Sequence, residues 1–211
     1  LASDSDEAMA YAVQGGQAVV GSGLAMVDER TWFPREPVDT LPRFNAIYDA
    51  RLETWKRHEL AKAVESVLLT YTPSYDTPLP LAFDRVREQL PNAFFANHEL
   101  NSGTYRRFEH DELPRLYAQA NVGLCLSAVE GCMRASMQYL LCGLPVVSTR
   151  SVGGRDRYFG TGYCRVVPKD DPDEVAFAVR QLMALNLDRA RIREHVGHIL
   201  AFDRYNVLLD V

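Results

Sequence analysis

One strand–helix–strand unit restricts the fold of this chain more than any other feature of its sequence. Residues 122–127 form an apolar run of the length of a buried strand, and a Glu-Gly pair ends it. Residues 131–142 are rich in helix-compatible side chains, and Gly143 before a proline is a typical C-terminal stop. A second apolar strand follows at 145–149. Two apolar strands joined by a helix indicate a parallel sheet.

The same alternation of apolar strands and helices continues from Phe44 to the C-terminus. Strands are expected at 44–50, 65–72, 92–97, 122–127, 145–149 and 164–168. Helices are expected near 56–64, 79–89, 111–120, 131–142, 172–186 and 188–205. Strands that are apolar throughout predict an α/β fold, a doubly wound parallel sheet covered by helices on both faces. In such a sheet, ligands bind beyond the carboxyl ends of the strands.

The N-terminal part of the chain differs from the rest. Within residues 1–43, a helix is expected at 4–13 and a short strand at 18–21. Residues 37–42 (PVDTLP) have the composition of a linker. We therefore expect a short N-terminal appendage, followed by one domain that covers residues 44–211.

Composition excludes several classes of function. A chain of 211 residues with 47% hydrophobic content can bury one sizeable core. Its net charge of −5 argues against a nucleic-acid-binding surface, which needs clustered excess Lys and Arg. No apolar run approaches the length of a transmembrane helix. The four cysteines show no CxxC spacing, so they are interpreted as reduced core residues of a cytoplasmic protein.

The helix expected at 131–142 opens directly after a strand and a glycine turn. The first N–H groups of a helix have no partner inside the helix, so they form a ready anion site beyond the strand. The backbone of Gly131, Cys132 and Met133 is therefore predicted to bind a diphosphate, since the side chains there offer little. Catalysis by the Cys132 thiol is disfavoured because no histidine lies near it in sequence.

Three elements together resemble the donor-binding domain of retaining GT-B glycosyltransferases, in the group whose signature is Glu, seven residues, Glu. The core match is EGCMRASMQYLLCGLPVVST, with Glu130 in the first acidic position and Gln138 in place of the second. Residues 44–56 (FNAIYDARLETWK) resemble the element in which Arg-Leu and then Lys follow a strand. Residues 111–120 resemble the short helix before the core strand. The resemblance covers about residues 44–185.

The resemblance implies a role for each matching residue. Arg51 and Lys56 would neutralise the donor diphosphate, Glu130 would meet hydroxyls of the transferred sugar as the catalytic residue, and Gln138 would bind the ribose. Simpler interpretations stay open: surface charges for Arg51 and Lys56, a helix cap for Glu130, and a solvent-facing position for Gln138. Since a carboxylate accepts from two ribose hydroxyls at once, Gln138→Glu is expected to tighten nucleotide binding.

The implied function is transfer of a sugar, with retention, from a nucleotide-activated donor to an acceptor hydroxyl on an unknown sugar, lipid or protein. This chain would be the Rossmann-like C-terminal half of a GT-B fold and inactive alone, with residues 1–43 as the end of the acceptor domain. No metal or other cofactor is expected, because protein cations and a helix N-terminus serve the diphosphate. Two DxD sequences occur, at 4–6 and 171–173, but in the second Asp171 is better interpreted as a helix N-cap. The protein is expected in the cytoplasm, with peripheral membrane contact left open.

Other functions on the same fold remain alternatives. A non-catalytic nucleotide-sugar-binding or regulatory domain is favoured by the Glu-to-Gln departure at Gln138. A nucleotide-sugar epimerase or a phosphorylase is also open, although no context for a pyridoxal-phosphate lysine is visible. Arg155 and Arg157 either reach the cleft or are loop charges, and His58 is expected on a solvated helix.

Overall fold

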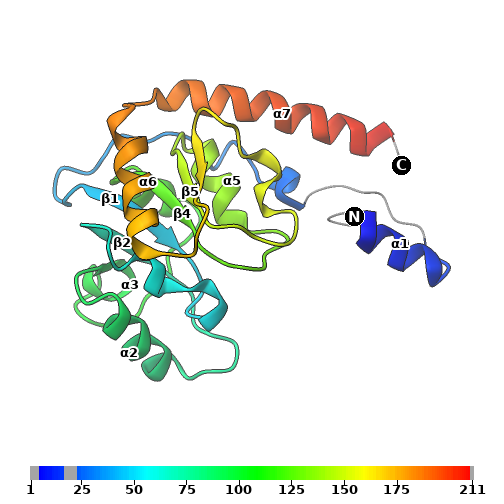
Figure 1. Cartoon of the computed structure of the whole chain (residues 1–211). Helices are drawn as coiled ribbons and strands as arrows, with labels where there is room; N and C mark the ends of the chain where they lie inside the picture. The colour runs from blue at the N-terminus through cyan, green and yellow to red at the C-terminus, as the bar shows by residue number, and fades with distance from the viewer. Residues whose placement is uncertain (1–4, 17–22, 210–211) are drawn as a thin grey trace.

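A single parallel sheet organises the molecule (Figure 1). The computed structural model describes residues 5–16 and 23–209, so the strand expected at 18–21 and Asp4 of the first DxD sequence lie outside the described residues. The strands are β1 (Phe44–Asp49), β2 (Val67–Thr70), β3 (Phe94–Phe95), β4 (Ala120–Cys125), β5 (Val146–Ser148) and β6 (Cys164–Val166). Their order is β3-β2-β1-β4-β5-β6, and all neighbouring pairs are parallel. The predicted fold is confirmed.

Helices connect the strands and cover the sheet. They are α1 (Ser5–Val13), α2 (Leu79–Gln89), α3 (Ala96–Glu99), α4 (Leu113–Tyr117), α5 (Arg134–Leu141), α6 (Pro172–Ala184) and α7 (Arg189–Leu209). The 3₁₀ turns are η1 (Gly23–Met26), η2 (Thr54–Lys56), η3 (His58–Ala61) and η4 (Arg155–Tyr158). Every residue of β2 and β5 is buried, as expected for a sheet covered on both faces. The predicted cap is confirmed, since the Asp171 side chain accepts from two N–H groups at the start of α6.

Two expected helices differ near the sheet's carboxyl edge. The helix predicted at 56–64 is the pair of short turns η2 and η3, separated by Arg57 with a φ of 52°. The helix predicted from Gly131 begins at Arg134, and its N-cap is Met133. Glu130 therefore lies in a loop and does not cap α5. The interpretation of Glu130 as a helix cap is wrong.

The order of the strands creates a switch point between β1 and β4. From β1 the sheet continues to β2 and β3, and from β4 it continues in the other direction to β5 and β6. A crevice opens at the carboxyl edge where such a reversal occurs. α5 packs closely over this point because Gly123 of β4 has no side chain: a Cβ there would lie 2.4 Å from the Tyr139 ring.

The segment before β1 is joined to the domain by its hydrophobic core and by α7, which runs along the top of Figure 1. Trp32 is buried and stacks on Tyr117 of α4, with ring centroids 5.5 Å apart. From α7, the Arg204 guanidinium donates to the Val27 carbonyl over 2.8 Å. This part of the expected appendage therefore shares the core of the domain.

Candidate functional site

A cavity of about 520 Å³ opens at the carboxyl edge of the sheet, at the switch point. Its wall is built from segments that lie next to different strands. These are residues 49–56 after β1, 70–75 after β2, 107–113 before β4, and 130–138 after β4. Six of the seven predicted site residues line it; they are Arg51, Lys56, Glu130, Cys132, Met133 and Gln138. Gly131 lies between two of these lining residues. The fold thus brings together segments more than 70 residues apart in sequence.

Arg51 lies on the wall of the cavity just after β1. Its guanidinium donates to the Pro73 carbonyl over 2.6 Å and lies over the Tyr75 ring, 3.7 Å from the ring centroid. The loop after β2 therefore holds the Arg51 side chain beside the cavity. This fixed cation is one of four Arg and Lys residues that line the cavity, with Lys56, Arg107 and Arg134.

Another of these cations, Lys56, forms an ion pair with Glu130 across the switch point. Only 11% of the Lys56 side chain and 18% of the Glu130 side chain are exposed. The Lys56 carbonyl is also fixed, since it accepts a 2.5 Å hydrogen bond from the Tyr48 hydroxyl of β1. The interpretation of Lys56 as an ordinary surface charge is therefore wrong.

Glu130 is held by the loop that follows β5. Its N–H donates to the Val152 carbonyl over 2.9 Å, and its own carbonyl accepts from Arg155 N–H over 3.3 Å. Gly153, with a φ of +110°, lies against it, and a Cβ at this position would come within 2.6 Å of the Glu130 carbonyl oxygen. The glycine is needed both for its backbone angle and for this close approach.

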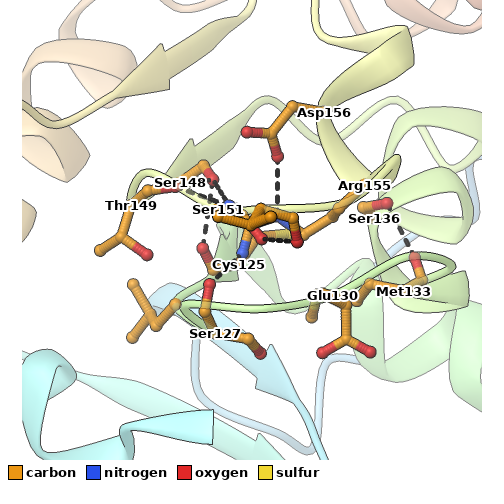
Figure 2. Close-up of polar contacts among 12 residues, drawn as sticks. Cys125, Ser127, Glu130, Met133, Ser136, Ser148, Thr149, Ser151, Arg155 and Asp156 are labelled. Atoms are coloured by element: carbon orange, nitrogen blue, oxygen red, sulfur yellow. Dashed lines mark hydrogen bonds and ion pairs between the residues drawn. The ribbon is translucent and has the colours of Figure 1, made fainter. Parts of the chain in front are cut away.

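Arg155 is a buried structural residue (Figure 2). Its guanidinium donates to the carbonyls of Ser127 and Thr149, to the Ser148 hydroxyl over 2.6 Å, and to the Asp156 carboxylate over 2.7 Å. In Figure 2 these contacts gather around Arg155, and the Glu130 carboxylate points away from them. Arg155 therefore ties the ends of β4 and β5 together and neither lines the cavity nor acts as a loop charge.

Of two other basic residues, Arg157 and His58, only His58 differs from its sequence-based interpretation. Arg157 forms an ion pair with Asp203 of α7 over 2.9 Å and does not line the cavity. His58 is only 1% exposed, in the turn η3, with its ring centroid 5.1 Å from that of Tyr48. Burial, with Arg85 and Lys56 nearby, lowers its pKa to about 3. The expectation of a solvated helix residue is wrong because the chain after β1 folds back onto the sheet.

The loop before α5 offers backbone donors to the cavity. Among the described residues, the N–H groups of Gly131, Cys132 and Met133 have no hydrogen-bond partner. Cys132 and Met133 line the cavity. Partial burial raises the pKa of the Cys132 thiol, which favours the neutral form and agrees with its exclusion as a nucleophile. The segment can present N–H groups to an anion, although helix geometry begins only at Arg134.

Gln138 belongs to a polar cluster that the sequence did not reveal. It is only 8% exposed, so the interpretation as a solvent-facing residue is wrong. The Tyr117 hydroxyl lies 3.2 Å from Gln138 Oε1 and donates to Asp49 Oδ2 over 2.5 Å. Burial raises the pKa of Asp49, which also lines the cavity. Asp49 could have been noticed as a carboxylate that ends an apolar strand, but no sequence signal separates Tyr117 from other helix residues.

Comparison with known proteins identifies the family of this domain. The model of the family described as glycosyl transferases group 1 matches residues 76–184, more than half of the chain. The chain belongs to the group 1 glycosyltransferases. Comparison with curated protein sequences finds no significant match to this glycosyltransferase domain.

Solved structures show the same fold as this glycosyltransferase domain. The C-terminal domain of the group 1 glycosyl transferase LpcC from Francisella tularensis is 16% identical with a TM-score of 0.55, covering 85% of this chain and 98% of that one. A sucrose-phosphate synthase from Thermosynechococcus elongatus is 19% identical with a TM-score of 0.65, covering 96% of this chain and 55% of that one. HepE from Anabaena, in complex with UDP, is 17% identical with a TM-score of 0.63, covering 96% and 58%. The chain thus has the fold of a GT-B C-terminal domain and spans little more than half of the latter two proteins.

The described part of the glycosyltransferase domain has neither a membrane-spanning helix nor a cluster of metal ligands. No described helix is both long and apolar enough to cross a membrane. Within the same part of the chain, no group of three or more His, Cys, Asp or Glu side chains could hold a metal ion.

Proposed function

We propose that this chain binds the nucleoside diphosphate part of a sugar donor in the cavity between β1 and β4. It would be the donor-binding half of a retaining glycosyltransferase that transfers the sugar to an acceptor hydroxyl. The observation that carries the proposal is that Arg51, Lys56, Cys132 and Met133 line one cavity, where the N–H groups of Cys132 and Met133 have no partner among the described residues. The UDP bound to HepE, which has the same fold, supports a nucleotide as the ligand.

The charges and donors of the cavity suit a diphosphate. A pyrophosphate group carries several negative charges, and fixed cations with backbone donors stabilise it both when bound and when it leaves. Lys56 already has a partner in Glu130, so we propose that its ammonium turns to the diphosphate when the donor binds. Glu130 is then free to accept from hydroxyls of the transferred sugar, the catalytic role proposed for it.

The proposal also gives a role to the segment before β1 and an expectation for the activity of the chain alone. The segment that ends at residue 43 would be the connection from an acceptor domain, and that domain would supply the acceptor site. The chain by itself would bind donor without transferring the sugar. A non-catalytic nucleotide-sugar-binding domain would bind in the same way, and only transfer in the presence of the acceptor domain separates the two.

Calorimetry with UDP, GDP and ADP tests the binding step. A charge-assisted hydrogen bond contributes about 1.5–3 kcal/mol, so Arg51→Ala and Lys56→Ala should each weaken binding about tenfold or more. Lys62→Ala is the matched control, because Lys62 is exposed and does not line the cavity. Circular dichroism would establish that each variant is folded. A double variant of Arg51 and Lys56 that binds as tightly as the unchanged chain would refute the site.

A further inference from the structure

In the cluster of Asp49, Tyr117 and Gln138, two acceptors compete for one hydroxyl proton. This competition determines which way the Gln138 carboxamide is turned. The Tyr117 hydroxyl has one proton but lies near two acceptors, Asp49 Oδ2 at 2.5 Å and Gln138 Oε1 at 3.2 Å. Hydrogen bonds to a carboxylate are shorter and stronger than those to a neutral amide. The proton therefore lies between Tyr117 and Asp49.

This leaves the Tyr117 oxygen as an acceptor toward Gln138. A carbonyl oxygen placed against it would bring two acceptors together with no hydrogen between them. The oxygen and nitrogen of a carboxamide are nearly identical in shape, so their assignment follows from their hydrogen bonds. With the amide turned over, Gln138 Nε2 donates to Tyr117, and Oε1 turns toward the cavity that Gln138 lines.

We propose that Asp49 is a positioning residue which, through Tyr117, sets Gln138 as the acceptor for a hydroxyl of the bound ligand. The inference rests on the proposed function, under which this hydroxyl belongs to the ribose of the donor. The negative charge that a glutamate would carry at position 138 is supplied instead by Asp49, on the other side of the Tyr117 hydroxyl.

A glutamate at position 138 would be a poor ligand in this setting. It has no hydrogen to give to Tyr117, and its carboxylate would share the single Tyr117 proton with Asp49. At pH 7.5 the two carboxylates repel each other, so the added charge at position 138 is unfavourable. The charges of Lys56 and His110 stabilise the Asp49 carboxylate, while burial disfavours a second charge beside it. Under this proposal, Gln138→Glu is expected to weaken nucleotide binding, which is the opposite of the expectation from the sequence.

The proposal is tested by exchanging the acid and the amide between positions 49 and 138. Binding is measured by calorimetry for Gln138→Glu, for Asp49→Asn and for the double variant, using the tightest-binding of UDP, GDP and ADP. At pH 7.5 we expect Gln138→Glu to bind about tenfold more weakly and Asp49→Asn a few-fold more weakly, in line with the loss of one or two hydrogen bonds. The double variant should return to within about threefold of the unchanged chain, because Tyr117 can then donate to Glu and accept from Asn.

Two further measurements distinguish this role from a merely structural one. Lowering the pH should restore binding to Gln138→Glu alone, since protonation of the added carboxylate supplies the missing donor. The 2′,3′-dideoxy form of the same nucleotide should bind equally to all variants. A double variant as weak as Gln138→Glu, or a Gln138→Glu variant that binds as well as the unchanged chain, would overturn the inference.

Inorganic pyrophosphate separates this inference from the proposed function. It has no ribose, so its affinity should depend on Arg51 and Lys56 and be the same in the variants of Asp49 and Gln138. If pyrophosphate and all three nucleotides fail to bind, the proposed function fails, and the inference fails with it. If pyrophosphate binds normally but the exchange shows no restoration, only the positioning role of Asp49 is refuted.

Discussion

Acid should unfold this domain through His58, which is buried beside the cavity. The His58 ring is 1% exposed, and its Nε2 has no hydrogen-bond partner among the described residues. Burial, followed by the charges of Arg85 and Lys56, lowers its pKa from 6.5 to about 3. Because the unfolded chain takes up a proton near pH 6.5 and the folded chain does not, the stabilising effect of neutral His58 is fully present above pH 6.5. It is lost as the pH falls from 6.5 toward 3.

The size of the effect follows from the two pKa values. In the interval between them, each pH unit lowers the free energy of unfolding by about 1.4 kcal/mol. Between pH 7 and pH 4.5 this amounts to about 2.5 kcal/mol, a large fraction of the roughly 5–15 kcal/mol that stabilises a typical domain. His58 lies in η3, two residues after Lys56 of η2, so we expect these two turns to open first.

Urea unfolding at pH 7, 6, 5 and 4.5 measures this contribution. The difference in free energy of unfolding between the unchanged chain and His58→Phe should change by about 2.5 kcal/mol over this range, with the variant gaining relative stability in acid. His198→Asn is the control, because His198 is exposed on α7 and should leave the pH profile unchanged. The difference between the free energies of unfolding of the two chains cancels the contribution of the carboxylates, because both chains contain the same carboxylates. If His58→Phe and the unchanged chain lose stability in parallel, His58 is not held neutral by burial and the reasoning is wrong.

Two predictions concern the loop after β5. Gly153→Ala should weaken nucleotide binding about tenfold by displacing the Glu130–Gly131 peptide, which leads into the N–H groups of Cys132 and Met133. The reason is that a Cβ at a φ of +110° would lie 2.6 Å from the Glu130 carbonyl oxygen and 3.0 Å from the Gly131 nitrogen. Calorimetry against Gly162→Ala, where a Cβ meets nothing within 4 Å, checks this, and equal effects of the two would contradict it. Arg155→Met should lower the free energy of unfolding by about 3 kcal/mol or more, since buried acceptors at the ends of β4 and β5 lose a charged donor. Urea unfolding measures this change, and a loss below about 1 kcal/mol would show that Arg155 is dispensable.

Features that depend on local sequence were predicted well. The helix expected at 79–89 is α2 with the same bounds, and Asp171 caps α6 as expected. The apolar runs became β1 to β6, although α3 takes up part of the run at 92–97 and leaves β3 only two residues long. Periodicity, caps and stops act within a few residues of one another, so a single sequence contains them in full.

The predicted site residues lie together, but their surroundings could not be predicted. Arg51, Lys56, Glu130 and Gln138 line one cavity because all parallel strands end at the same edge of the sheet. Their proposed roles with a ligand stay predictions. The Lys56–Glu130 ion pair joins residues 74 positions apart, and the contact of Asp49 with Tyr117 spans 68. Pairs of this kind depend on how whole elements pack, which no local pattern records.

The sequence by itself determined the alternation of strands and helices from Phe44 onward, and therefore that a parallel sheet with a ligand edge is formed. Only the tertiary structure decided which polar groups are buried. Arg155 and His58 look like surface residues in sequence, yet one ties two strands together and the other is held neutral in the core. The physical reason is that hydrophobic periodicity is a property of one element, whereas the burial and partners of a charge depend on every element packed around it.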